Sequence, residues 1–314
     1  MSDAAHKLQK AGKFPLRLSQ MADAPKFSPP KVEDHRMIEA KFSRASASAS
    51  AAPSATALAA RALLRPQSAL QHSVHHAANA KMPSGLGLDS ADVRARMVER
   101  LRAGGVRAEA VLNAIAKVQR HRFVDTALVT QAYEDTSLPI GHGQTISKPS
   151  VVARMIELLM SSTQARVSGH LGKVLEIGTG CGYQAAVLAC LAKQVVSVER
   201  LKALHDKAQA LLLAERGSVV SFAMRLVYGD GMLGHAPNSP YDSIIAAAGG
   251  EALPDAWLTQ LAVGGRLVAP VQMASDRGGT THQALVVVDR TENGFEQHVF
   301  ETVQFVPLKS GMVR

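Results

Sequence analysis

Cysteine is scarce in this sequence, aromatic residues are few, and no long apolar run occurs. The two cysteines, Cys181 and Cys190, lie in one segment that is expected to enter and form a single helix. That placement suits neither a disulfide nor a set of metal ligands, so we expect a reducing compartment and no metal site. No apolar stretch approaches the roughly 20 residues that cross a bilayer, and the N-terminus lacks an export signal. These absences predict a cytoplasmic protein without a membrane contact.

The excess of basic residues is concentrated in the first part of the chain. The net charge is +9, and residues 1 to 90 hold 12 Lys and Arg against 6 Asp and Glu. The remainder is only mildly basic, and it contains no stripe of Lys and Arg interleaved with aromatic residues. We therefore do not expect the folded part of the chain to bind nucleic acid.

Residues 1 to 89 are expected to form a basic, low-complexity and disordered extension. A Ser/Ala-rich stretch covers residues 41 to about 70, and no acidic residue occurs between Glu39 and Asp89. Such a segment buries too little apolar surface to offset the entropy that ordering would cost. Its bias towards Arg, Ser and Ala also resembles an organelle transit peptide. Because the stretch is internal and follows acidic residues, a solvated linker is the favoured interpretation.

Residues 90 to 314 are expected to form one folded domain that opens with a helical cap over about residues 90 to 160. Ser90 offers an N-cap for the first helix, and two glycines after residue 103 end it. A third helix is expected from about Ser150 to Leu159. The first two helices have apolar residues at helical spacing, which are Val93, Met97, Val98 and Leu101, then Val111, Leu112, Ile115 and Val118.

The second half of the chain alternates apolar runs with helical patterns. Because helices separate the strands, right-handed crossovers and a mainly parallel, doubly wound α/β sheet are expected. Two further runs, 284–288 and 299–306, have only a turn between them and predict an antiparallel hairpin at one edge of the sheet. The strands expected in the parallel part are 174–177, 195–198, 226–228, 243–247 and 266–270.

A glycine turn follows the first of these strands. Gly178, Gly180 and Gly182 form a GxGxG pattern at the start of a helix, where backbone can approach a ligand closely. The dinucleotide fingerprint is GxGxxG, so this spacing disfavours a dehydrogenase. Glu199 ends the second strand, where a carboxylate can accept hydrogen bonds from both ribose hydroxyls of a nucleoside. The alternatives are a turn that only allows close packing, and a solvated strand end at which Glu199 pairs with Arg200.

Two more segments offer polar groups to a ligand. Asp230 follows the third strand and could accept a hydrogen bond from the adenine amino group, although an ordinary Asx turn is the alternative. Residues 138 to 149 have the sequence LPIGHGQTISKP, in which Gly and Pro residues indicate a loop of defined shape. The hydroxyls of Thr145 and Ser147 are available in this loop. From spacing alone, Ser147 is more simply the N-cap of the helix that Pro149 opens.

These segments resemble the protein L-isoaspartate O-methyltransferase family. GTGCGYQ with QTIS upstream is far more specific than a generic glycine turn. The sequence departs from the family at residues 247 to 250, where a Thr-Ala-Ala-Pro-like stretch is common, and at Gln272, where Gly is usual. The resemblance runs from about Arg94 to Gly311, and its motifs are ALVTQAYEDTSLPIGHGQTISKP, VLEIGTGCGYQAAVLA, VVSVER, YGDG, LPDAWLTQLAVGGRLVAPV and FVPL.

The resemblance implies the class I methyltransferase fold, S-adenosylmethionine as the cofactor, and a monomer that acts on isoaspartyl proteins and peptides. The implied reaction methylates the free α-carboxylate of an L-isoaspartyl residue, and the ester then collapses to a succinimide that can reopen as aspartate. A carboxylate is ionised at neutral pH, so no strong general base is needed. The resemblance places the catalytic hydroxyl on Ser147 and the cofactor contacts on Glu176, Gly178, Glu199, Asp230 and Gly231. We also expect Thr145, Ile146, Gly180 and Gly182 to bind the cofactor.

Two other functions share part of the pattern. A small-molecule methyltransferase would have the same glycine turn, Glu199 and Asp230, but the QTIS loop and the FVPL segment argue against it. A cofactor-binding protein that has lost catalysis and acts as an interaction module is supported only by the departures at residues 247 to 250.

Overall fold

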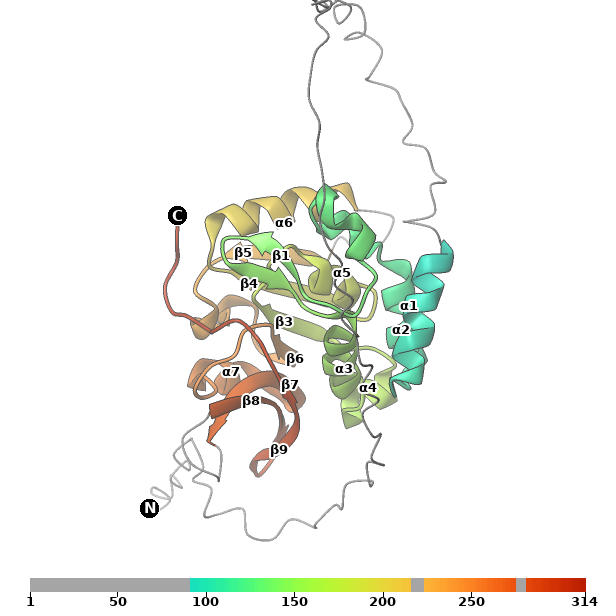
Figure 1. The fold of residues 1–314 in the computed structure, drawn as a ribbon. Helices are drawn as coiled ribbons and strands as arrows, with labels where there is room; N and C mark the ends of the chain where they lie inside the picture. The colour runs from blue at the N-terminus through green and yellow to red at the C-terminus, as the bar shows by residue number, and fades with distance from the viewer. Residues whose placement is uncertain (1–90, 216–222, 275–280) are drawn as a thin grey trace, which may run out of the picture. The chain divides into compact units, whose positions relative to one another are not determined.

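The computed structural model describes residues 91–215, 223–274 and 281–314, which are coloured in Figure 1. The predictions for residues 1 to 89, and for Ser90 as a helix cap, lie outside these residues. None of the helices within the described ranges is long and apolar enough to cross a membrane. The α-helices there are α1 (Ala91–Ala103), α2 (Glu109–Lys117), α3 (Pro149–Met160), α4 (Thr163–Ser168), α5 (Tyr183–Ala189), α6 (Lys202–Ala214) and α7 (Asp255–Gln260).

Seven strands form the main sheet in the order β5-β4-β3-β6-β7-β8-β9. The strands from β5 to β7 pair in parallel, whereas β8 pairs antiparallel with both β7 and β9. The order of winding reverses between β3 and β6, and open α/β sheets bind ligands at the carboxyl ends of strands near such a point. The strands are β3 (Lys173–Ile177), β4 (Gln194–Glu199), β5 (Met224–Tyr228), β6 (Tyr241–Ala246), β7 (Leu261–Ala274), β8 (Thr281–Thr291) and β9 (Gly294–Val303).

The two faces of the sheet pack into two separate apolar clusters. Successive strand residues point to opposite faces, so Val174 and Leu175 of β3 belong to different clusters. One cluster joins the sheet to α1, α2, α3, α5 and α6. The other joins it to α7 through Trp257 and Leu258. Helices therefore cover both faces, as the doubly wound fold requires, and α1 to α4 lie side by side next to the sheet in Figure 1.

The structure confirms the mainly parallel sheet and the antiparallel hairpin at its edge, but it moves the last strand. The turn expected over residues 289 to 294 is shorter, because β8 runs on to Thr291 and pairs with β9 at Gly294. The apolar run at 299–306 suggested a later strand. The residues of β9 are mostly exposed because it is an edge strand, and its first half, residues 294–298, contains one apolar side chain, so no apolar pattern marks where it begins.

The loop expected over residues 138 to 149 contains a small antiparallel hairpin of its own. Strands β1 (Leu138–Gly141) and β2 (Gln144–Ile146) pair with each other and form a second, two-stranded sheet. His142 turns the hairpin with a positive φ of 54°. This hairpin carries the Thr145 and Ser147 hydroxyls to the carboxyl edge of the main sheet.

Burial of the sheet predicts a large effect at Ile245, which lies in β6 and is fully buried. We expect Ile245→Ala to lower the free energy of unfolding by about 2–5 kcal/mol, because it removes apolar contacts and leaves a cavity. Val263→Ala in β7 is the matched control, since Val263 is 56% exposed and its truncation should change stability by less than about 0.5 kcal/mol. Urea unfolding of both variants measures the difference, and equal losses would contradict the assigned burial.

Candidate active site

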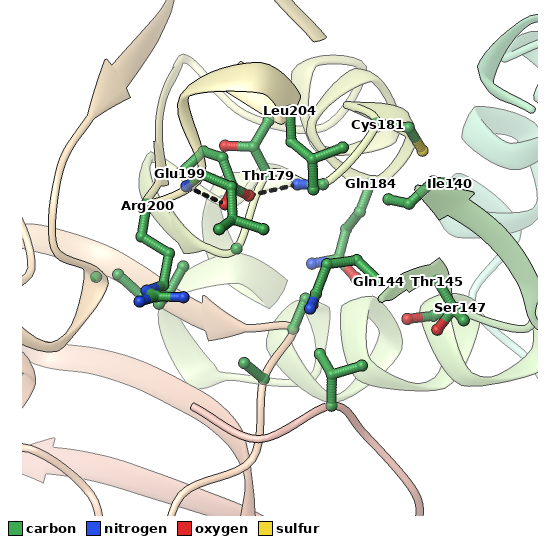
Figure 2. A pocket seen from close by; sticks show the side chains of 18 of the residues that line it. Ile140, Gln144, Thr145, Ser147, Thr179, Cys181, Gln184, Glu199, Arg200 and Leu204 are labelled. Carbon is green, nitrogen blue, oxygen red and sulfur yellow. Dashed lines mark hydrogen bonds between the residues drawn. The ribbon is translucent and has the colours of Figure 1, made fainter. Parts of the chain in front are cut away.

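A cavity of about 300 Å³ lies at the carboxyl ends of β3 and β4, bordered by the β1-β2 hairpin and the C-terminal segment. Figure 2 shows Glu199 and Arg200 on one side of it and Thr145 and Ser147 on the other. The residues around it include Ile140, His142, Gln144–Ser147, Ile177–Cys181, Tyr183, Gln184, Val198–Leu201, Leu204, Gly231, Ala247, Ala248 and Val306–Lys309.

The glycine turn forms part of the cavity wall, and its backbone conformation requires glycine. Gly180 lines the cavity with φ +57°, and Gly182 begins α5 with φ +93°. A Cβ atom at Gly182 would lie 3.0 Å from Leu212 of α6, and one at Gly180 would lie 3.2 Å from Ile140 of β1. Both the positive φ and the close neighbours favour glycine, so the turn can present bare backbone to a ligand. Gly178 and Gly180 line the cavity, whereas Gly182 lies behind it.

Glu199 is held firmly at the end of β4. Its Oε2 accepts a hydrogen bond from the Gly180 backbone N–H at 2.9 Å, and its Oε1 accepts one from the Leu201 N–H at 2.9 Å. The residue is only 5% exposed. Arg200 turns away and donates to the Gly311 and Ser310 carbonyls. The alternative of a solvated strand end, at which Glu199 pairs with Arg200, is therefore wrong.

Glu176 lies beneath the cavity wall and does not line the cavity. The side chain is fully buried, and its Oε2 accepts a hydrogen bond of 2.5 Å from the Ser197 hydroxyl. The same hydroxyl is 2.6 Å from the Thr179 hydroxyl, and Thr179 lines the cavity. Burial raises the pKa of Glu176 from 4.5 to about 8, against the opposing effect of the Ser197 hydrogen bond. Glu176 therefore supports the glycine turn from below.

Asp230 sits at the predicted place after β5 but already has two backbone partners. Its Oδ1 accepts from the Met232 N–H at 2.9 Å, which is the Asx turn of the alternative interpretation. Its Oδ2 accepts from the Gly311 N–H at 2.6 Å and so fastens the C-terminal segment. Gly231, the next residue, lines the cavity. A contact between Asp230 and adenine stays a prediction.

Thr145 and Ile146 of β2 and the next residue, Ser147, all line the cavity. Ser147 does not cap α3, because the N-cap position is Lys148 and no side chain there makes a capping hydrogen bond. The α3 N-terminus is held instead by Asp135, which accepts from the Ser150 N–H at 2.9 Å and from the Ser150 hydroxyl at 2.7 Å. The interpretation of Ser147 as a helix cap is therefore wrong, and its hydroxyl lies at the cavity.

The C-terminal segment was not assigned to the site from the sequence, although FVPL was among the matched motifs. It borders the cavity because the backbone of Gly249 accepts from Leu308 at 2.8 Å and donates to Val306 at 2.9 Å. These bonds use only the backbone of the stretch 247–250, in which the sequence departs from the family. The departure therefore leaves this part of the cavity wall intact.

The sequence pattern of one protein family, Protein-L-isoaspartate(D-aspartate) O-methyltransferase, matches residues 92–313. The chain belongs to this family. A protein-L-isoaspartate O-methyltransferase of Leptothrix cholodnii is 60% identical over 248 residues, covering 79% of this chain and 84% of the relative. One of Burkholderia vietnamiensis is 45% identical over 322 residues, covering 97% of this chain and 99% of the relative. Its match therefore extends into the first 89 residues.

Solved structures agree with this assignment. A protein-L-isoaspartate O-methyltransferase has a TM-score of 0.59 and 25% identity, covering 70% of this chain and 67% of that one. The fold is also that of a Plasmodium falciparum structure described as a putative member of the family in complex with S-adenosyl-L-homocysteine, with a TM-score of 0.56, 22% identity and coverage of 68% and 97%. This member of the family is an S-adenosylmethionine-dependent enzyme that methylates isoaspartyl residues of proteins.

The raised pKa of Glu176 predicts how stability depends on pH. The unfolded chain releases this proton near pH 4.5 and the folded chain near pH 8. The contribution of Glu176 to the free energy of unfolding is therefore fully present below pH 4.5 and is lost as the pH rises towards 8. We expect Glu176→Gln to remove most of this fall. Free energies of unfolding at pH 5 and pH 8 test it, with Glu296→Gln on the exposed face of β9 as the control. An unchanged pH dependence in Glu176→Gln would contradict the assigned protonation.

Proposed function

We propose that the cavity binds S-adenosylmethionine against the wall formed by the glycine turn and Glu199, and that Ser147 orients the substrate carboxylate from the other side. The observation that supports this is the placement of Glu199 and Ser147 on opposite sides of one cavity (Figure 2). The residues present suit the cofactor. The Glu199 carboxylate lies at the wall, where it can accept hydrogen bonds from ribose hydroxyls. The glycine turn and Gly231 keep side chains out of the space.

When bound, S-adenosylmethionine supplies a methyl group that is activated by a positively charged sulfur. The substrate carboxylate has a reference pKa of about 4 and is already ionised at neutral pH, so the protein need not remove a proton from it. The cavity is built accordingly. Burial raises the pKa of Tyr183 to about 12 and also raises the pKa of the Cys181 thiol. Neither side chain can act as a base at neutral pH.

What remains for the protein to provide is placement. Correct orientation of two reacting groups can supply up to about 7–11 kcal/mol in the best model systems. Ser147 follows directly on β2, and its half-buried side chain lies at the cavity wall. A hydroxyl there can donate one hydrogen bond to a carboxylate oxygen. The side chain would fix the direction from which that oxygen approaches the methyl group.

The remaining features of the enzyme follow from the same site. A monomer suffices for the proposed chemistry, because the glycine turn, Glu199 and Ser147 all belong to this chain. A site that recognises a free carboxylate and backbone can accept isoaspartyl residues in many proteins and peptides. The mildly basic composition after residue 90 argues against nucleic-acid binding by the folded part. We also propose that the enzyme is cytoplasmic and acts without a membrane.

Two substitutions separate the roles of the two sides of the cavity. We expect Ser147→Ala to lower kcat for an isoaspartyl peptide by about tenfold or more, with little change in affinity for S-adenosylhomocysteine, since the hydroxyl contacts only the substrate. Glu199→Gln should weaken the affinity for S-adenosylhomocysteine and change kcat less. Methyl transfer and calorimetry measure both effects, and the matching aspartyl peptide is the substrate control. Equal turnover on the two peptides, or normal turnover of Ser147→Ala, would contradict the proposal.

We further propose that residues 1 to 89 are an extension that is dispensable for catalysis, because each matched motif lies beyond them. A chain that starts at Ser90 should keep the melting temperature and the activity on a short isoaspartyl peptide. Thermal unfolding and the methyl-transfer assay test this. Aggregation or lost turnover of the shortened chain would mean that the boundary is wrong. A salt-dependent loss confined to large protein substrates would instead indicate that the basic extension binds an acidic surface.

A further inference from the structure

Arg120 is a fully buried cation in the short 3₁₀ helix η2 (Arg120–Phe123). Among the residues that the structure describes, no carboxylate forms an ion pair with it. Removing a guanidinium from water without such a partner is costly, so a protein retains one only where it makes several good contacts. Burial accordingly lowers the pKa of Arg120 below its ordinary value.

Arg120 donates to backbone carbonyls of the segments that flank the β1-β2 hairpin. Its Nη2 donates to the Ser147 carbonyl at 2.7 Å, directly after β2. Its Nε donates to the Ala132 carbonyl at 2.8 Å, and Nη2 also approaches the Thr136 carbonyl at 3.5 Å, both ahead of β1. One planar guanidinium therefore holds the segments that enter and leave the hairpin.

The same guanidinium also contacts the cofactor side of the site. Its Cζ lies 4.8 Å from the centre of the Tyr183 ring, within the range of a cation–π contact. Tyr183 is the first residue of α5, directly after the glycine turn, and it lines the cavity. Arg120 thus connects the segment that carries Ser147 to the glycine turn, which is hydrogen-bonded to Glu199.

We propose that Arg120 is a positioning residue for methyl transfer, which fixes the Ser147 backbone and thereby the direction of the Ser147 hydroxyl in the cavity. This role rests on the proposed function of Ser147 in orienting the substrate carboxylate. A rigid connection matters because Ser147 lies at the end of a two-stranded hairpin, and an isolated hairpin of this size is only marginally stable. Lysine cannot replace arginine here, since its compact ammonium group has one nitrogen, whereas Arg120 reaches the Ala132 and Ser147 carbonyls from two separate nitrogen atoms of one planar group.

The matched substitutions Arg120→Lys and Arg122→Lys test the role of Arg120. Both residues belong to η2 and both variants keep the charge, but Arg122 pairs with Glu215 at 2.6 Å and is 44% exposed. We expect Arg120→Lys to lower kcat for an isoaspartyl peptide by about tenfold to a hundredfold, as misplacement of a catalytic group does. The dissociation constant of S-adenosylhomocysteine should change by less than about threefold, because the glycine turn and Glu199 are untouched. Arg122→Lys should behave as the unaltered enzyme.

Combination with Ser147→Ala separates positioning from general stability. If Arg120 acts through Ser147, the double variant should be no slower than the slower single variant, whereas independent effects would multiply. The concentration of active sites is measured by S-adenosylhomocysteine binding, and kcat is calculated per active site, so that unfolded protein does not lower the apparent kcat. Normal kcat in Arg120→Lys, or losses that multiply, would overturn the role of Arg120. Normal turnover of Ser147→Ala would instead overturn the role of Ser147, so the two failures can be told apart.

Discussion

The hydrogen bond from the Gly180 N–H to the Glu199 carboxylate joins the two halves of the cofactor side of the site. It can form only because β3 and β4 are parallel neighbours in register, with Ile177 opposite Val198, so that both strands end at the same edge. The turn after β3 then passes within reach of the last side chain of β4. The start of α5, the placement of Tyr183 and the cavity wall all depend on this hydrogen bond between Gly180 and Glu199.

Buried polar groups hold the site together from behind. Glu176 and Ser197 form a hydrogen-bonded pair under the turn that extends to Thr179. Arg120 does the corresponding work under the hairpin. Such groups are costly to bury, but a hydrogen-bonded network fixes one arrangement of the backbone more sharply than apolar packing does. A reaction that needs placement more than proton transfer benefits from such rigidity.

The C-terminal segment closes the site by backbone contacts. Gly249 pairs with Val306 and Leu308, and Asp230 accepts from Gly311. Arg200 adds hydrogen bonds to the carbonyls of Ser310 and Gly311. Since the bonds to Gly249 use only backbone atoms, the unusual sequence of residues 247–250 does not disturb them. They also explain why Arg200 is not the partner of Glu199.

Local pattern was sufficient for the parallel strands, the helices between them, the glycine turn and the position of Glu199, because periodicity, strand ends and positive φ are properties of a few consecutive residues. The family motifs likewise pointed to Ser147. The sequence did not locate the start of β9, whose exposed edge carries no apolar period. Nor did it reveal that Asp135, not Ser147, holds the start of α3, or that Arg120 lies under the hairpin. Those contacts join residues 15 and 27 positions apart, and only packing in three dimensions determines which distant carbonyl or carboxylate a side chain meets.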